Sequence, residues 1–317
     1  MDAFLEKHLQ GVSRTYAILV PMLPDTLAEA VGMAYLLMRI VDTLEDDPHL
    51  TTAQRLRYFA LLDAALAGNA AAAQDLAQPL GDTEDERALM HDAAQVLARV
   101  RALEPEYHAA VATCAQAMIG GVRRLIARSA ERELAYPAVR DVAELREYCY
   151  YVAGVVGEML CGMMAHFLRW PELWRRRDEA VELGIGLQLV NILKDAGKDS
   201  AQGRRYLPLA EGGASVQAEV HRAVLREARQ SLQTGIAYVL ALPAWARELR
   251  SFSGLPIAWG AMTLTRAERA TDAVKIGRGD IRDSIERFSE LAGDDQALGQ
   301  WLSELLESGA ARRTNDG

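Results

Sequence analysis

Four acidic residues, Asp42, Glu45, Asp46 and Asp47, stand at the end of a hydrophobic, helix-forming segment. In a helix, Asp42 and Asp46 lie one turn apart and leave the same face. Like charges at that spacing, close to a helix C-terminus, weaken the helix through mutual repulsion and through the helix dipole. A bound cation would offset both effects, so the run predicts a metal site with Asp42, Glu45 and Asp46 as candidate ligands. The alternative interpretation is a solvated helix end.

A second group of oxygen-bearing side chains recurs at steps of three, four and four residues: Gln188, Asn191, Asp195 and Asp199. This spacing places them on one stripe of an otherwise apolar helix. Amide and carboxylate oxygens suit a hard cation such as Mg²⁺, whereas zinc would favour His or Cys. The alternative is a polar surface in which Lys194 and Lys198 form exposed ion pairs.

Two helices that carry carboxylates and face each other across a bundle would bridge Mg²⁺ ions to a diphosphate. The metals would neutralise the leaving group, so that an allylic C–O bond could ionise to a carbocation. An apolar interior, poor in water, would protect that cation from quenching.

The elements that must position these residues are predicted to be helices. Ala, Leu, Glu, Arg and Gln dominate, apolar residues recur at three- and four-residue steps, and no sustained β-type alternation is present. We expect an all-α fold, a single large helical bundle with a central cavity over residues 1–317. The expected helices span residues 25–46, 52–67, 84–102, 105–129, 141–168, 171–194, 216–240, 244–250, 255–272 and 280–307, with connections at 68–82 and 196–213.

Composition excludes several classes of protein. Half of the residues are apolar and a quarter are charged, which is typical of a globular chain. The net charge of −9 disfavours nucleic-acid binding. Three cysteines without CxxC spacing fit a reducing cytoplasm. Residues 150–168 are apolar enough for a membrane span, but Glu158 at the centre favours a buried helix, so we expect no transmembrane anchor.

Five segments, in order and with fitting spacing, resemble the squalene/phytoene synthase family. They are Ser13-Arg14-Thr15-Tyr16; the run from Tyr35 through Arg39 and Asp42 to Asp47; the run from Tyr148 through Tyr151 and Gly154 to Gly157; the run from Gln188 to Asp199, followed by Gly203-Arg204-Arg205-Tyr206; and Val274-Lys275-Ile276-Gly277-Arg278-Gly279.

This resemblance implies a head-to-head prenyltransferase that joins two prenyl diphosphates through a cyclopropyl intermediate. It implies Mg²⁺ held by Asp42, Glu45, Asp46, Asp195 and Asp199. It assigns Tyr151, Tyr35 and Arg39 to the reacting centre, and it implies diphosphate contacts for Ser13, Arg14, Arg39, Gln188, Asn191, Arg204 and Arg205. Without the resemblance, Tyr35 and Tyr151 could equally be core tyrosines with satisfied hydroxyl groups. Gly154 and Gly157 are expected to permit close helix approach.

The segment from Val274 to Gly279 resembles the nicotinamide-site loop of squalene synthases. It implies NADPH contacts for Asn191, Lys275 and Arg278; the alternative is a solvated basic loop. We therefore favour farnesyl diphosphate as the substrate and squalene as the product. The alternatives are a dehydrosqualene or phytoene synthase, a terpene cyclase on the same scaffold, and a non-catalytic helical binding protein. We expect a cytoplasmic protein with peripheral membrane contact for an apolar product; the substrate chain length and the oligomeric state stay open.

Overall fold

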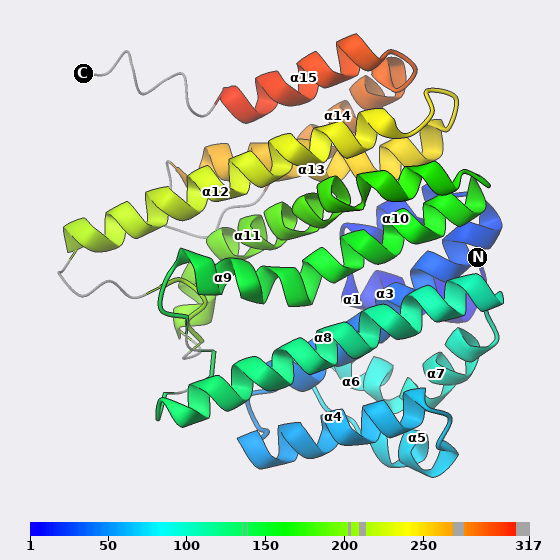
Figure 1. The fold of residues 1–317 in the computed structure, drawn as a ribbon, viewed down its shortest axis with the longest axis vertical. Helices are drawn as coiled ribbons and strands as arrows, with labels where there is room; N and C mark the ends of the chain where they lie inside the picture. The colour runs from blue at the N-terminus through cyan, green and yellow to red at the C-terminus, as the bar shows by residue number, and fades with distance from the viewer. Residues whose placement is uncertain (135, 138, 202–203, 209–213, 269–275, 309–317) are drawn as a thin grey trace. The chain divides into compact units, whose positions relative to one another are not determined.

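The computed structural model describes residues 1–134, 136–137, 139–201, 204–208, 214–268 and 276–308 (Figure 1). Every regular element in these ranges is a helix, which confirms the predicted all-α class. The chain divides into two compact units: unit 1 comprises Met1–Ala127 and Gly162–Pro171, and unit 2 comprises Arg128–Cys161 and Glu172–Gly317. The single-domain organisation stays a prediction.

Unit 1 is built around α3 (Asp25–Asp46), whose bounds agree with the predicted 25–46. Asp25 lies in its first turn, where a carboxylate interacts favourably with the helix dipole. The helix packs against α1 (Ala3–Val12), α4 (Thr52–Leu66), α6 (Glu84–His91) and α7 (Ala93–Arg101). The remaining elements are α2 (Tyr16–Leu19), η1 (Val20–Met22), α5 (Ala70–Leu76) and most of α8 (Pro105–Glu131).

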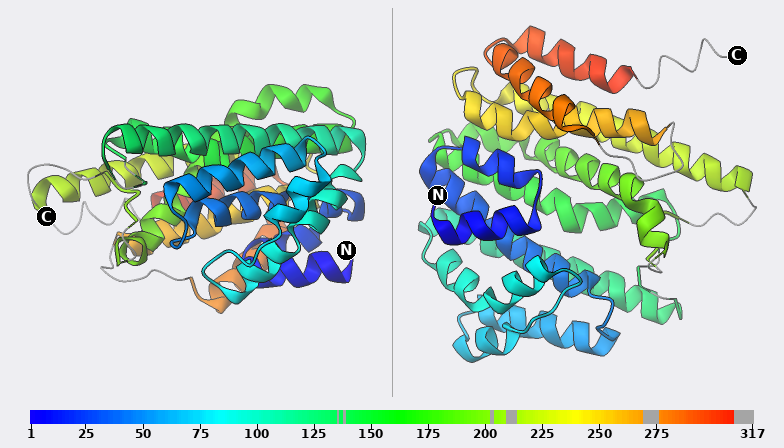
Figure 2. Two further views of the ribbon diagram at one scale, coloured as in Figure 1. Left: turned by 90° about the horizontal axis from the view of Figure 1, so that it is seen from below. Right: turned by 180° about the vertical axis from the view of Figure 1, so that it is seen from behind.

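Unit 2 is built around α11 (Arg177–Ala201), which packs against α9 (Val142–Cys149), α12 (Ala214–Ala241) and α13 (Arg247–Ala267). A π-helical turn, η2 (Tyr150–Gly154), joins α9 to α10 (Val155–Phe167), whose part from Gly162 onward belongs to unit 1, and η3 (Pro171–Arg176) precedes α11. The last described helices are α14 (Arg278–Leu291) and α15 (Asp295–Glu307), which lie beside α13 in the right-hand view of Figure 2. Each of the two acidic motifs therefore lies on the central helix of its own unit.

Several predicted boundaries were wrong. The helices α1, α2 and α5 were missed, and α11 continues to Ala201 beyond the predicted end at 194. The predicted helix 84–102 is divided at Asp92, and the predicted helix 280–307 is divided by a turn in which Asp294 caps α15. Conversely, α13 is one helix through Pro256, where the sequence suggested two.

The apolar run Val142–Phe167, which comprises α9, η2 and α10, is long and apolar enough to cross a membrane by length and composition. More than half of its most apolar window, 56%, is buried within the protein, as in the core helix of a globular fold. This agrees with the predicted buried helix.

Candidate functional site: two polar stripes on the central helices

The first stripe lies on α3 and consists of Tyr35, Arg39, Asp42 and Asp46. Between Val31 and Asp47 these four residues are partly exposed, and all the others are buried. Their spacing of four, three and four residues places them on one helical face. We call this set the α3 stripe. It presents two carboxylates, a guanidinium and a phenol along a stretch of α3 that is otherwise buried.

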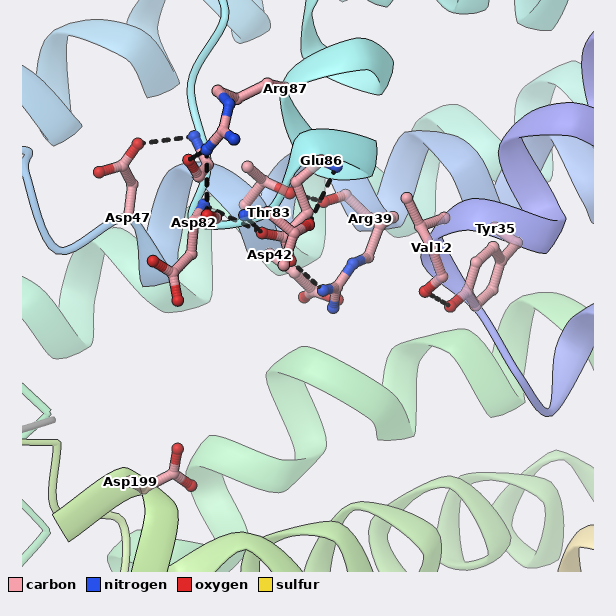
Figure 3. A network of polar contacts seen from close by, with 12 residues as sticks. Val12, Tyr35, Arg39, Asp42, Asp47, Asp82, Thr83, Glu86, Arg87 and Asp199 are labelled. Atoms are coloured by element: carbon pink, nitrogen blue, oxygen red, sulfur yellow. Dashed lines mark hydrogen bonds and ion pairs between the residues drawn. The ribbon is translucent and has the colours of Figure 1, made fainter. Parts of the chain in front are cut away.

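Arg39 is held in place by Glu86 on α6 (Figure 3). Its Nη2 donates to Glu86 Oε1, while Nη1 lies 3.9 Å from Asp42 Oδ2. The other Glu86 oxygen, Oε2, accepts the backbone N–H groups of Asp82 and Thr83 at 3.0 Å each, and Thr83 Oγ1 accepts the Glu86 N–H at 3.2 Å. Glu86 therefore closes a capping box at the start of α6 and anchors the guanidinium at the same time.

The Nε atom of Arg39 is buried and has no hydrogen-bond partner within the described part of the chain. A buried, unsatisfied donor on a cation is costly, and an anionic oxygen would satisfy it. The donor set of Arg39 therefore fits a phosphate oxygen.

The pKa of the Asp42 carboxyl is strongly raised. Burial raises the pKa of its carboxyl to about 7, and the nearby charges of Asp46 and Glu86 act in the same direction, whereas Arg39 opposes the rise. The side chain is 35% exposed and so remains within reach of a ligand. Two crowded carboxylates, one of which resists ionisation, suit a hard divalent cation, because such a cation supplies the missing positive charge.

The acidic run is not a uniform ligand cluster. Asp47 builds the turn after α3, because its carboxylate accepts the N–H groups of Gly81 and His49 at 2.8 Å each. Arg55 caps the helix end by donating to the carbonyl groups of Leu44 and Asp47 at 3.2 and 3.0 Å. This guanidinium compensates the helix dipole. Glu45 is 3% exposed, so the open face carries Asp42 and Asp46. The metal-ligand role of Glu45 stays a prediction.

Ser13 and Tyr35 meet where α1 ends. Ser13 Oγ accepts the N–H of Tyr16 at 2.9 Å, and the Tyr35 hydroxyl donates to the Val12 carbonyl at 3.4 Å. The rings of Tyr16 and Tyr35 pack with centroids 4.9 Å apart. Burial raises the pKa of Tyr35 despite an opposing hydrogen bond with Ser13, so its phenol stays protonated at neutral pH. Arg14, the next predicted diphosphate contact, is exposed.

The second stripe lies on α11 and consists of Gln188, Asn191, Asp195 and Asp199; we call it the α11 stripe. Leu189, Val190, Ile192 and Leu193 between them are buried, as the predicted periodicity requires. Gln188, Asp195 and Asp199 are partly exposed, and Asn191 is exposed.

Two cations accompany the α11 stripe. Lys194 Nζ lies 3.2 Å from Asp195 Oδ2 and donates to Asn191 Oδ1 at 3.3 Å. Arg204, a predicted diphosphate contact, donates from Nη2 to Asp199 Oδ1 at 3.0 Å. The stripe therefore combines hard oxygen donors with cations, and its ion pairs Lys194–Asp195 and Arg204–Asp199 fit the alternative of a polar stripe with ion pairs as well as a cation site.

Tyr151 lies in the π-helical turn η2 and is partly exposed. Such turns are often found at functional sites. The flanking helix packs closely on α11: a Cβ atom at Gly157 would lie 2.1 Å from the Ala180 carbonyl oxygen, and one at Gly184 would lie 2.2 Å from the Ala153 carbonyl oxygen. Gly157 therefore permits close helix approach, as predicted, and Gly184 completes the contact.

The remaining predicted residues are only partly described. Arg205 is exposed, and Arg278 is exposed at the first position of α14. Lys275 lies outside the described residues. The proposed NADPH contacts of Asn191, Lys275 and Arg278 stay a prediction.

Sequence reasoning did not find Glu86. Its only signal was the spacing Thr83-x-x-Glu86, which marks a helix start and says nothing about Arg39. It also did not find an exposed cluster of Glu104, Glu106 and His166 in unit 1, whose potential ligand atoms lie within 4.8 Å of one another. His166 packs edge-on against Tyr107 and hydrogen-bonds Glu104 at 3.1 Å, so it is a packed histidine with an acidic partner.

Solved structures share this fold. The structure of TcSQS in complex with the ligand BPH1237 superposes with a TM-score of 0.81 at 22% identity, covering 99% of this chain and 91% of that one. A dehydrosqualene synthase structure gives a TM-score of 0.57 at 20% identity, covering 91% and 95%. The fold is thus the all-α fold of isoprenoid synthases.

The family model for squalene/phytoene synthase matches residues 9–287, and the chain belongs to this family. The squalene synthase of Eremothecium gossypii is 29% identical over 203 residues, and that of Saccharomyces cerevisiae is 28% identical over 209 residues. Each match covers 63% of this chain and 44% of the relative, so the chain matches less than half the length of these relatives.

Proposed function

We propose that the protein is a Mg²⁺-dependent head-to-head prenyltransferase that joins two farnesyl diphosphates to presqualene diphosphate and converts this intermediate to squalene. The observation that carries the proposal is the α3 stripe, in which Tyr35, Arg39, Asp42 and Asp46 are the open positions of the otherwise buried stretch from Val31 to Asp47. The family membership and the matching oxygen ligands of the α11 stripe support it.

The donor set fits Mg²⁺, which binds proteins through a few carboxylates together with phosphate oxygens and water. Asp42 and Asp46 would hold Mg²⁺ on α3, and Asp195 and Asp199 would likewise hold Mg²⁺ on α11. When bound, the ion supplies positive charge that stabilises a departing diphosphate. The role of the acidic residues is to keep that charge in a fixed place.

The other residues of the stripes bind and orient the substrate. Arg39, anchored by Glu86, offers a fixed guanidinium and an unsatisfied Nε–H to a diphosphate oxygen. The ring face of Tyr35 can stabilise an allylic cation, and its protonated hydroxyl stays bonded to the Val12 carbonyl, so it does not act as a nucleophile. Tyr151, in the π-helical turn, is the proposed acid or base that moves the proton lost when the cyclopropane closes.

Reduction of the second cation requires a hydride donor, which we propose to be NADPH held by Asn191, Lys275 and Arg278. If this assignment holds, Lys275→Ala lowers squalene but spares presqualene diphosphate, whereas an equal loss of both products contradicts it.

The test of the proposed function is an incubation of the purified protein with farnesyl diphosphate and Mg²⁺, with and without NADPH, followed by gas chromatography–mass spectrometry. Squalene that forms only with NADPH supports the proposal. A product from a single prenyl unit or the absence of any product overturns it.

The metal assignment is tested with Asp42→Asn and Asp195→Asn, which should abolish turnover. Asp25→Asn is the matched control, because Asp25 is an exposed acid on the same helix as Asp42 but off the stripe. Turnover by the two stripe variants at the rate of the control would remove the metal assignment.

A further inference from the structure

Three of the five tryptophans are exposed at turns rather than packed in the core. Trp170, Trp174 and Trp245 are 36%, 41% and 73% exposed, whereas Trp259 is 6% exposed. Single exposed apolar side chains are common on protein surfaces, so the surroundings of these rings, rather than their number, decide whether they mark a binding surface.

Two of these rings, Trp174 and Trp245, lie at the same end of unit 2. Trp174 belongs to η3, directly before α11, and Trp245 lies in the turn between α12 and α13. The Cys161 thiol donates to the Leu173 carbonyl in η3 at 3.5 Å and also hydrogen-bonds Tyr238, three residues before the end of α12. In Figure 1 the green turn before α11 and the yellow turn after α12 lie at one end of these helices.

The η3 turn is locally basic in an acidic protein. Residues 169–179 contain four arginines and three acidic residues, a net charge of +1, whereas the whole chain carries −9. Arg176 pairs with Glu179 at 2.9 Å and Arg177 with Asp178 at 3.5 Å, and the Arg177 guanidinium lies 5.8 Å from the centre of the Trp174 ring. Arg169 and Arg175 are exposed and form no ion pair with the described residues, so these two are the available cations of the turn.

The turn before η3 carries an exposed cation at a conformationally unusual position. Arg169, two residues after the end of α10, has φ 51°, a left-handed conformation that glycine adopts at lower energy. The N–H of Trp170 closes this turn on the Ala165 carbonyl at 2.9 Å. An arginine therefore occupies a position whose backbone conformation favours glycine, and this exposed arginine stands next to an exposed tryptophan.

We propose that the η3 turn and the α12–α13 turn together form a docking surface for an anionic lipid bilayer. Tryptophan is the residue most suited to the interface between lipid headgroups and acyl chains, because its ring is amphipathic. Arginine is attracted to anionic headgroups. A protein partner would require a continuous apolar patch, whereas here single rings stand beside arginines on tight turns. The surface gives a location to the peripheral membrane contact expected from the sequence, and it does not depend on the proposed reaction.

The test measures co-sedimentation of the full-length protein with vesicles of phosphatidylcholine alone and of phosphatidylcholine with phosphatidylglycerol. We expect binding to the anionic vesicles, weakened by high salt, and little binding to the neutral ones. Trp174→Ser combined with Trp245→Ser should weaken binding at least tenfold. Arg175→Gln combined with Arg176→Gln should weaken it by about fivefold or more, the factor for one arginine near an anionic surface, because Glu179 already pairs with Arg176.

Matched controls are available in the same unit. Leu134→Ser removes an apolar side chain that is 50% exposed. Arg282→Gln combined with Arg287→Gln removes two exposed arginines of α14, one of which pairs with Glu290 as Arg176 pairs with Glu179. Equal loss of vesicle binding in the controls, or no binding of the unaltered protein to anionic vesicles, overturns the proposal. Thermal unfolding of each variant confirms that it is folded.

Discussion

Glu86 joins two functions that one substitution can separate. Its carboxylate closes the capping box of α6 and anchors Arg39 of the α3 stripe. Glu86→Gln keeps the size of the side chain and its capping oxygen but removes the negative charge. The protein itself indicates that an amide suffices for the cap, because Gln54 closes the equivalent box at the start of α4.

The stability change is expected to be small. Hydrogen bonds to charged groups contribute about 1.5–3 kcal/mol, and the partial exposure of the pair places it at the low end. With Glu86 14% and Arg39 30% exposed, we expect the free energy of unfolding to fall by about 1.5 kcal/mol or less.

The effect on turnover is expected to be larger. Without its anchor, the Arg39 guanidinium is free to turn toward Asp42 Oδ2, which lies 3.9 Å from Nη1. A displacement of about 1 Å in a positioning group can cost about 100-fold in rate, so we expect turnover to fall between about tenfold and 100-fold.

The pH profile provides a second, independent readout. The charge of Glu86 raises the pKa of Asp42, and Arg39 lowers it. Glu86→Gln removes the charge of Glu86 and lets the Arg39 guanidinium approach Asp42, and both changes lower the pKa of Asp42. The acid limb of the pH–rate profile should therefore move to lower pH. A purely structural role for Glu86 would leave that limb unchanged.

The assay compares wild type, Glu86→Gln and Glu84→Gln by steady-state turnover from pH 5.5 to 9 and by chemical denaturation. Glu84 is exposed in the first turn of the same helix, so its substitution removes the same charge without touching Arg39. Unaltered turnover and an unaltered acid limb in Glu86→Gln would refute the anchoring argument.

Three further outcomes are expected. Burial raises the pKa of Asp42 from 3.8 to about 7, so the folded state holds this proton more tightly than the unfolded chain does. Metal-free stability should therefore fall as the pH rises through this range, while Mg²⁺ affinity rises, and Asp42→Asn should flatten both trends in denaturation and calorimetry. Gly157→Ala should lower the free energy of unfolding by about 1–3 kcal/mol through overpacking, whereas Gly197→Ala, with no atom within 4 Å, should raise it by up to about 1 kcal/mol. Arg250→Met should lower the free energy of unfolding by about 3 kcal/mol, because Arg250 is 1% exposed and its guanidinium donates to buried carbonyl groups. Arg282→Met, the control, should change this free energy by less than about 0.5 kcal/mol in the same denaturation assay.

Helix periodicity predicted the two central helices because their patterns are long and strongly apolar. It failed where a distant residue decides the local structure. The break between α6 and α7 lies at Asp92, whose carboxylate hydrogen-bonds the buried His8 at 3.0 Å. Pro256 lies within a helix because α13 is buried along its length, and this packing outweighs the local cost of a proline.

In the candidate site, too, local features could be predicted from the sequence, whereas features that depend on distant residues could not. The spacing of Asp42 and Asp46 is a local property and could be found by reading the sequence. The different fate of Asp47 depends on Gly81, and the anchoring of Arg39 depends on Glu86, which lie 34 and 47 residues away. Acidic residues next to one another in sequence thus serve a turn, a core and an open face, and their residue types alone do not separate these roles.

The burial pattern of α3 has a consequence for protein engineering. Between Val31 and Asp47 only four positions are open, so this part of the helix tolerates little random change, because most substitutions there alter packed side chains. A library of variants screened for a new substrate chain length would therefore contain many misfolded proteins if α3 were randomised. Neighbouring helices are the better positions to vary. The segment of α3 that carries the stripe is thus constrained by folding as well as by chemistry.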